Sequence, residues 1–522
     1  MTGRRFSTFP YLPVCALFSL GITLSGCATD ALELAPSAPD KPWVAGEKDA
    51  KNKTVATDAT AKSGAADFGV ASNPELALIS TPVEVDNRRS YDLPALIDLA
   101  QRSNPTTRNA WERAKQAALA VGMTEAVSLP MISANVIGGY QKSKRPVDVP
   151  IVGDKDIDST VKGVVPALAL KWLVFDFGQR AALRDAAREV SFAANVTFNA
   201  LHQKVIFDVT RRYYEHSAAV TGHQIAQQTL RNSKAVLAAV QAKLNEGRAT
   251  TIELALARQQ VAQAELRIVR ANGQEQNTYQ LLLAGMGVNA TLDLKIKGAL
   301  DRKIPSRFDG VTQEVIEAAL SRRPDIQAGY AAMQASQAGI RVAQAEFMPK
   351  VFIAATLSKP SGDFNIGALP DLNSQSSSKG VIVGASMPIF DGGLRAAQLK
   401  NAQSVANVAS ETFRKMQLDA VAEIVLASNA LKTALAANNA ANTLVQTSNV
   451  AFDASLEAYK NGLGTITMVN ETNNALLDAR LAQADAKAAA FIAAANLAFF
   501  AGALTSSDQA TNLSQLPGVA TP

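Results

Sequence analysis

The chain of 522 residues is poor in the side chains on which many enzymes and metal sites depend. It has two cysteines and three histidines, and both cysteines, Cys15 and Cys27, lie near the N-terminus. No thiol follows Cys27, so no internal disulfide can form beyond it. His216 and His223 lie seven residues apart, but no third ligand follows at the spacing of a zinc site. We therefore expect these two histidines and His202 to be exposed or packed, with no metal bound.

Sequence fingerprints of catalysis are missing too. The chain has no P-loop, no G-x-S-x-G motif and no dinucleotide-binding glycine motif. Its net charge of +5 comes from basic residues spread along the chain, and no basic block is interleaved with aromatics, which make up 6% of the residues. Nucleic-acid binding is therefore not expected. We expect no enzyme activity and no cofactor.

The N-terminal segment has the layout of a secretory signal. Arg4 and Arg5 precede an apolar stretch that runs to Leu24, and small residues then lead to Cys27. This order resembles the lipobox of bacterial lipoproteins, which implies that Cys27 becomes the lipid-modified first residue. Ala28 then permits sorting to the outer membrane. The alternative is an ordinary signal peptide with a chance cysteine. No other run of 18 apolar residues exists, which argues against transmembrane helices.

The rest of the chain is a duplication. Pro324 and Pro349 follow Pro105 and Pro130 at an offset of 219 residues. The Phe-Asp pairs at 175–176 and 390–391, and the glycines at 247 and 462, are 215 apart. A repeat of about 200 residues is too long for a short-period solenoid. We expect the following parts: signal peptide 1–26, lipidated N-terminal arm 27–88, first repeat 89–310, second repeat 311–505 and C-terminal tail 506–522.

Each repeat is expected to open with a helix that a proline interrupts. Proline disfavours helix at the residue before it, so Asn104-Pro105 and Arg323-Pro324 mark breaks. The second helix of each pair is expected over 106–128 and 325–347.

Strands are expected after the two junction prolines, Pro130 and Pro349. Apolar residues there alternate with small or polar ones over about ten residues, which suits transmembrane β-strands. The alternative is a buried sheet in a soluble protein. Four strands cannot enclose a barrel by themselves, because eight is the usual minimum. The expected strands begin after Pro130 and Pro349 and cover 164–176 and 381–390, with loops over 141–163 and 359–380.

Very long helices should follow the strands. Residues 394–461 contain neither glycine nor proline, and 179–246 contain only Gly222. At about 1.5 Å per residue such helices span roughly 100 Å. Glycine turns at Gly247 and Gly462 should end them. Return helices are expected over 250–284 and 465–501, with Thr250 and Thr465 as N-caps.

Four motifs in this order resemble the TolC family of bacterial outer-membrane channels, over about residues 89–505. They are Arg322–Ala328, Ala343–Pro349, Pro388–Gly393 and Tyr459–Gly462. The resemblance implies a mainly α protein with a transmembrane β-barrel. In this fold a homotrimer builds one 12-stranded barrel, with four strands per chain, which continues into a long α-helical periplasmic cylinder.

The resemblance also implies a passive exit duct in the outer membrane. Such a duct serves a tripartite efflux pump or a type I secretion system, together with a periplasmic adaptor protein and an inner-membrane transporter. The alternative is a structural or adhesin-like coiled-coil outer-membrane lipoprotein without a pore. The β-alternating segments favour the channel, because a coiled-coil spacer has no use for membrane-length strands.

The expected site residues follow from the same resemblance. A periplasmic gate is expected from residues just after the turns, namely Glu471, Glu253 and Met468, although Glu253 and Glu471 could equally lie on a solvated face. The adaptor is expected to dock on the turns, and the helix–strand junctions are expected to redirect the chain. The docking residues are Gly247, Arg248, Gly462, Leu463 and Gly464, and the junction residues are Pro130, Pro349, Asp176 and Asp391.

Overall fold

The computed structural model describes residues 85–86, 88–149, 153–298, 300, 302, 304–305, 307–366 and 372–504. All belong to Val83–Pro522, one of the two units into which the chain divides. The expected signal peptide, Cys27, almost all of the N-terminal arm and the C-terminal tail lie outside these residues. Side chains are described except within 145–157 and 364–374.

Each repeat opens with the expected broken helix. In the first, α3 (Leu93–Ser103) and α4 (Pro105–Ala126) meet at Asn104, whose side chain accepts a hydrogen bond from the Thr106 amide. Proline at the first helical position needs no amide partner, so it starts α4 without loss. In the second repeat, α7 (Gln313–Arg322) and α8 (Pro324–Ala345) meet at Arg323. The predicted breaks are confirmed.

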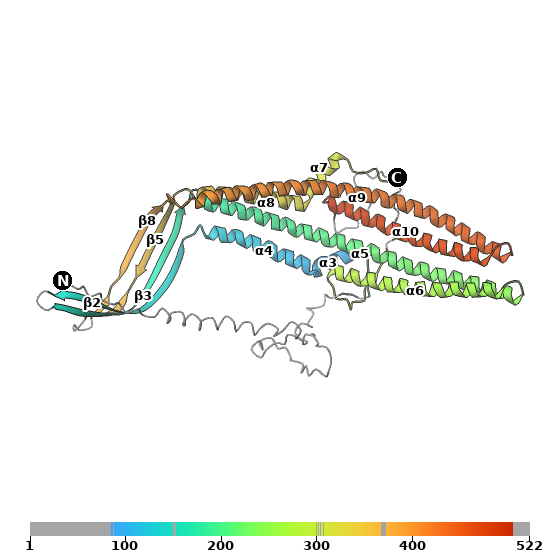
Figure 1. The fold of residues 1–522 in the computed structure, drawn as a ribbon, viewed down its shortest axis with the longest axis horizontal. Helices are drawn as coiled ribbons and strands as arrows, with labels where there is room; N and C mark the ends of the chain where they lie inside the picture. Colours follow the sequence, from blue (N-terminus) through green and yellow to red (C-terminus); the bar gives the residue numbers. More distant parts are fainter. Residues whose placement is uncertain are drawn as a thin grey trace, which may run out of the picture. The chain divides into compact units, whose positions relative to one another are not determined.

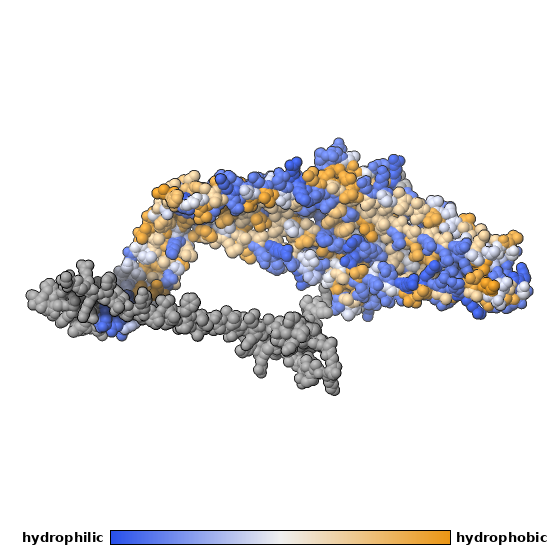
Figure 2. Space-filling view, in the orientation of Figure 1, coloured by the Kyte–Doolittle hydropathy of each residue, from blue (hydrophilic) through white to orange (hydrophobic). Residues whose placement is uncertain are grey.

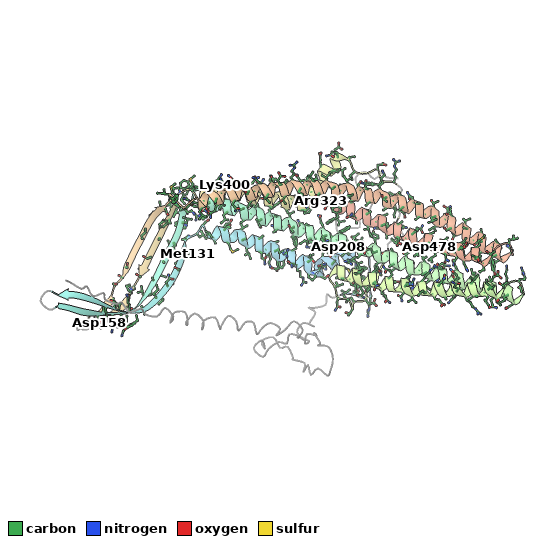
Figure 3. All side chains as sticks on the ribbon, viewed as in Figure 1. Met131, Asp158, Asp208, Arg323, Lys400 and Asp478 are labelled. Atoms are coloured by element: carbon green, nitrogen blue, oxygen red, sulfur yellow. The ribbon has the colours of Figure 1, made fainter. Side chains whose placement is uncertain are left out.

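Arg323 holds the second break in place. It is buried, donates to Asp325 and to Glu423 on α9 (Leu394–Lys460) at 2.6 Å each, and lies over the ring of Phe500. Burial pushes the pKa of Asp325 up, but the hydrogen bond and charge of Arg323 outweigh this and hold it below its ordinary value. Figure 3 labels Arg323 beside α9, and Asp208 at the position of the first repeat that matches Glu423.

The strands are longer than the sequence predicted. β2 (Met131–Val149) pairs along its whole length with β3 (Gly153–Phe175), from Met131 with Lys171 to Val149 with Gly153. The loop expected over 141–163 is therefore wrong, because cross-strand pairing continues into this polar segment. The loop expected over 359–380 is also wrong in part. It contains a further hairpin of β6 (Ser361–Ile366) and β7 (Leu372–Gln375) between β5 (Lys350–Ser358) and β8 (Ser378–Ser386).

One antiparallel sheet results. Near the helices its order is β2–β3–β5–β8. Farther from the helices β6 takes the place of β5 beside β3, and β7 pairs with the other edge of β6. Pro166, which has no amide hydrogen, lies opposite the gap between β5 and β6. The expected strand over 381–390 ends early, at Ser386, two residues before Pro388.

The sheet has two different faces. Cross-strand pairs put most of the apolar members of the four strands on one side, here called the apolar face. The opposite side, here called the small-residue face, carries many Ala, Gly, Ser, Thr and Asn residues. Its larger members include Met131, Ile137, Val165, Lys171, Leu173, Lys350, Phe352 and Ile382. The apolar face comprises Ile132, Ala134, Val136, Val164, Pro166, Leu168, Leu170, Trp172, Ile353, Ala355, Leu357, Val381, Val383 and Ala385.

The long helices follow as predicted. α5 (Gln179–Asn245) and α9 (Leu394–Lys460) have 67 residues each, and α6 (Thr251–Met286) and α10 (Ile466–Phe500) return from them. The side chains of Thr250 and Thr465 accept hydrogen bonds from the amides three residues on, so both predicted N-caps are confirmed. Among the described residues one helix, α9, is long and apolar enough to cross a membrane, a property that it shares with the buried core helices of soluble proteins.

The helices form a wall with two free edges (Figure 1). α5 packs between α4 and α8 near the strands and contacts α6 and α10 farther away, and α9 packs on α8 and α10. α3 packs on α5 and α6, and α7 packs on α8 and α9. One side of the wall therefore ends in β2, α4 and α6, here called the leading edge. The other side ends in β8 and α9, here called the trailing edge.

Three apolar clusters hold this wall together. The largest lies where α3 meets α5, α6 and α10, and includes Leu96, Tyr214, Leu283 and Phe491. A second joins α7 to α9 and α10, and the third lies near the glycine turns. On the visible side, Figure 2 shows hydrophobic residues gathered over the strands and hydrophilic ones along the middle of the helices.

Candidate functional site

The helix–strand junctions are built in the same way in both repeats. Asp176 accepts from the amide and the Nε of Arg180, at 3.1 and 2.7 Å, and Asp391 accepts from Arg395 at 3.1 and 2.6 Å. Each arginine also reaches back to a carbonyl at the end of the preceding short helix, in Val127 and Glu346. The predicted junction aspartates thus hold the start of each long helix to the turn before the strand.

The backbone at the junctions is tightly bent. Gly178 and Gly393 both have φ of 89°, a left-handed conformation that glycine adopts without a steric penalty. Gly392 has φ of 67°, and its counterpart Phe177 has φ of 51°. Left-handed backbone costs a residue with a side chain about 1–2 kcal/mol. Pro130 and Pro349 lie just before β2 and β5, as expected for residues that end the helical hydrogen-bond ladder.

The junction ion pair generates a prediction about stability. Asp176 and Arg180 are both largely buried, so Asp176→Asn leaves a buried guanidinium without its counter-charge. The free energy of unfolding should fall by about 3 kcal/mol, measured by denaturant unfolding of the purified protein. The matched control is Asp185→Asn, whose pair with Arg341 is half-exposed and should change it by less than about 1 kcal/mol. Equal effects of the two substitutions would contradict this role for the junction.

The two glycine turns, at the end of the helices far from the strands, make the same backbone hydrogen bonds. The Arg248 amide donates to Lys243 O and the Leu463 amide donates to Ala458 O, each at 2.8 Å. Gly247 and Gly462 have φ of 73° and 81°, as this helix-ending motif requires. Leu463 is 87% exposed, and Arg248 is exposed and paired with Glu246. The predicted docking residues are therefore at the surface of the turns, except Gly464, which packs against Ala458.

The gate residues predicted from the sequence do not come together as one acidic group. Glu253 accepts from the amide and the hydroxyl of Thr250, at 2.6 and 3.2 Å, and so completes a capping box. Glu471 and Met468 are exposed on the first turns of α10, and Glu471 makes no ion pair with a described residue. Its carboxylate is therefore the free acidic group of the predicted set.

Glu471 begins a line of acidic side chains. Asp478 and Asp485 follow at steps of seven residues, so all three lie on one face of α10, and all are exposed. Asp478, labelled in Figure 3, also borders a cavity of about 330 Å³ between α5, α6 and α10. Arg267 and Arg270 enter this cavity from α6. The matching positions of the first repeat carry Leu256, Gln263 and Arg270 instead.

The sequence did not reveal a cross-repeat contact at the turns. The ammonium group of Lys243, near the end of α5, donates to the carbonyl of Tyr459 and lies 4.4 Å from the centre of its ring. Tyr459 is buried in the apolar cluster with Val240, Phe452 and Ile466. Burial and the nearby charge of Glu253 raise the pKa of its hydroxyl. The contact ties the first helical hairpin to the second.

Farther from the turns, polar side chains also join the two helical hairpins. Asn474 accepts from Gln260 at 2.8 Å and from Arg267 at 2.9 Å, and buried Asn473 donates to Ser233. The repeat offset shows that the two hairpins differ in sequence at such contacts. Lys243 corresponds to Ala458 of the second repeat, so the two hairpins differ in sequence where they touch.

The histidines are packed or paired. His216 is buried and hydrogen-bonds to Thr278, and burial lowers its pKa more than Glu275 raises it. His223 lies 2.6 Å from Glu275. In the part of the chain that the structure describes, no three His, Cys, Asp or Glu residues form a group that could hold a metal.

Comparison with known proteins accounts for this architecture. Residues 96–288 and 315–503 match the family described as outer membrane efflux protein. The chain is 26% identical to the pyoverdine export outer membrane protein OpmQ of Pseudomonas putida, over 76% of the chain and 82% of that protein. It is 25% identical to the outer membrane protein OprJ of Pseudomonas aeruginosa, over 71% and 76%. The identity to the cation efflux system protein CusC of Escherichia coli is also 25%, over 62% and 67%.

Solved structures agree in fold. The crystal structure of CusC aligns with a TM-score of 0.67 at 20% identity, over 80% of this chain and 95% of that one. The CmeC outer membrane channel of Campylobacter jejuni gives 0.66 at 19%, over 80% and 88%. The two matched segments correspond to the two repeats. The chain is an outer-membrane efflux channel and belongs to the outer membrane efflux protein family.

Proposed function

We propose that three copies of this chain join edge to edge into a closed channel. In one copy β2 and β8 each pair with a single described strand, so both keep unpaired backbone groups. Lipid offers no hydrogen bonds to such groups, so an open sheet cannot remain in a membrane. Joining the β8 edge of one copy to the β2 edge of the next satisfies them. Three copies of four strands make twelve, which is enough for a barrel.

The helical edges support the same closure. Val408, Leu426 and Leu444 recur every 18 residues on α9, so they share one face, and they are 49–67% exposed. The leading edge also exposes apolar residues to match them. A contact between two different edges is head-to-tail, and it closes into a ring when the rotation allows. The exposed apolar residues of the leading edge are Trp111, Leu119 and Met123 on α4 and Ile252, Leu266, Val269 and Leu281 on α6.

The apolar face supports a barrel that faces lipid on its outside. It runs from Trp172 to the pair of Tyr140 and Lys162, ten residues along β3. Ten residues cover about 33 Å, and a strand tilt of about 40° reduces this to about 25 Å of height. That is the height of the apolar band of outer-membrane barrels, with an aromatic residue at each limit. This two-faced sheet is the observation that favours a channel over a structural or adhesin-like lipoprotein.

Closure of the ring is tested by charging the trailing edge. In the proposed trimer, Val408 and Leu426 are buried against the next copy, and burial of each side chain stabilises the contact by about 1.5–3 kcal/mol. The double substitution Val408→Glu/Leu426→Glu would instead bury two negative charges there. The purified double variant should be monomeric by light scattering and should give no discrete conductance in planar bilayers, while the unchanged chain is a conducting trimer. Leu463→Glu, which changes a still more exposed leucine at the turn, should remain trimeric. A monomeric, non-conducting unchanged chain would overturn the proposal.

We infer that the duct is passive and exports substrates supplied by partners. The family places the chain in the outer membrane, and among its relatives OpmQ is a pyoverdine export outer membrane protein and CusC is a protein of a cation efflux system. A periplasmic adaptor would dock on the exposed turns at Arg248, Leu463 and the adjoining glycines, and an inner-membrane transporter would deliver substrate. Loss of adaptor co-purification in Leu463→Asp tests this docking site. We also propose lipidation of Cys27, which palmitate labelling of the chain and of Cys27→Ser tests.

The gate at the turns is proposed to open by loss of the Lys243–Tyr459 contact. A hydrogen bond and a cation–π contact together contribute about 1–2 kcal/mol. Lys243→Met should therefore raise the ratio of open to closed channels by about 5–30-fold, seen as larger mean conductance in planar bilayers. The control is Lys234→Met on the same helix, whose contact with Glu265 is long and exposed. If both variants conduct like the unchanged chain, this contact does not hold the gate.

A further inference from the structure

The small-residue face of the sheet carries charge of one sign. Among the described side chains of β2, β3, β5 and β8, its charged members are Lys171 and Lys350, and it has no carboxylate. Lys171 pairs with Met131 and Ala354, and Lys350 pairs with Ser386. Each pair lies on the side of the sheet opposite to the apolar face.

Both lysines lie near the helical end of the sheet. Lys350 is four residues along β5 from Ala354, the partner of Lys171, or about 13 Å. Lys171 is exposed and Lys350 is half-buried, and neither makes an ion pair with a described residue. The carboxylates at the junctions, Asp176 and Asp391, are already paired with Arg180 and Arg395. The positive charge of the two lysines is therefore not neutralised within one copy.

This inference rests on the closed barrel proposed above. If the apolar face meets lipid, the small-residue face lines the pore, and three copies place six ammonium groups around its base. Charges of one sign inside a passage with low-dielectric walls concentrate ions of the opposite sign. Pore-lining charge is also a main determinant of channel selectivity.

We propose that Lys171 and Lys350 form a cationic collar at the base of the β-barrel, which gives this part of the duct a preference for anionic solutes. Solutes that carry carboxylate or phosphate groups would be drawn through the collar. The acidic line of Glu471, Asp478 and Asp485 lies on α10, far along the helices from the sheet. Its contribution to selectivity is separable by mutation.

Reversal potentials in a KCl gradient across a planar bilayer test the collar. Lys171→Glu/Lys350→Glu should lower the ratio of chloride to potassium permeability severalfold. The change should be larger near 0.1 M salt, where the Debye length is about 10 Å, than near 1 M, where it is about 3 Å. Lys171→Gln/Lys350→Gln, which places no new carboxylate in the pore, should shift the ratio in the same direction by less.

Two controls locate the effect. Lys379→Glu changes a lysine whose partner is Leu357 on the apolar face, and should leave the permeability ratio unchanged. Glu471→Gln should shift it toward chloride, opposite to the collar variants. A conducting trimer whose ratio is unaffected by both double substitutions, or equally affected by Lys379→Glu, would overturn the collar alone. A chain that gives no conducting trimer at all would overturn the closed barrel and the collar with it.

Discussion

One constraint governs this structure: a single copy leaves unpaired backbone groups and exposed apolar side chains along both edges of its sheet and helical layer. In one copy the sheet ends in β2 and β8, and the helical layer ends in α4 and α6 on one side and in α9 on the other. The strand edges present backbone donors and acceptors that lipid cannot satisfy. The helical edges expose apolar residues that water disfavours. The proposed head-to-tail contact would remove both costs, so a single symmetry would account for the barrel and the cylinder together.

Duplication makes this wall possible. Each repeat contributes two long strands of the sheet near the helices and one long helical hairpin, and the junctions between them use the same aspartate–arginine pair. The repeats differ in sequence where the first hairpin contacts the second. Lys243 of the first repeat contacts Tyr459 of the second, and its own counterpart is Ala458. The two repeats therefore share the same junctions, while the contact between Lys243 and Tyr459, which only one of them can supply, ties the first hairpin to the second at the turns.

Much of the fold could be predicted because its signals are local. Prolines end helices, glycines end the long ones, and Thr250 and Thr465 cap the return helices, since each effect depends on a few neighbouring residues. Alternation also indicated which residues share a face of the sheet. The length of β2 and β3 was missed because polar residues beyond the apolar band still pair across strands.

The site was harder to predict than the fold. Glu253 is a predicted gate residue whose carboxylate also caps its own helix, a local contact that was not anticipated from the sequence. The contact between Lys243 and Tyr459 joins residues 216 positions apart, so no local pattern reveals it. The role of the two lysines of the small-residue face depends on the strand register, which places them on the side of the sheet opposite to the apolar face.

Cross-linking between edges tests the central claim most directly. Leu119 on α4 and Val405 on α9 are exposed on opposite edges, and the chain has no cysteine beyond Cys27 to interfere. Chains that carry both Leu119→Cys and Val405→Cys, treated with a bis-maleimide in the membrane, should give covalent dimers and trimers and nothing larger. Chains that carry only one of the two cysteines should stay uncross-linked. Dimers formed by Val405→Cys alone would show α9 packed against its own copy, and would contradict the head-to-tail ring.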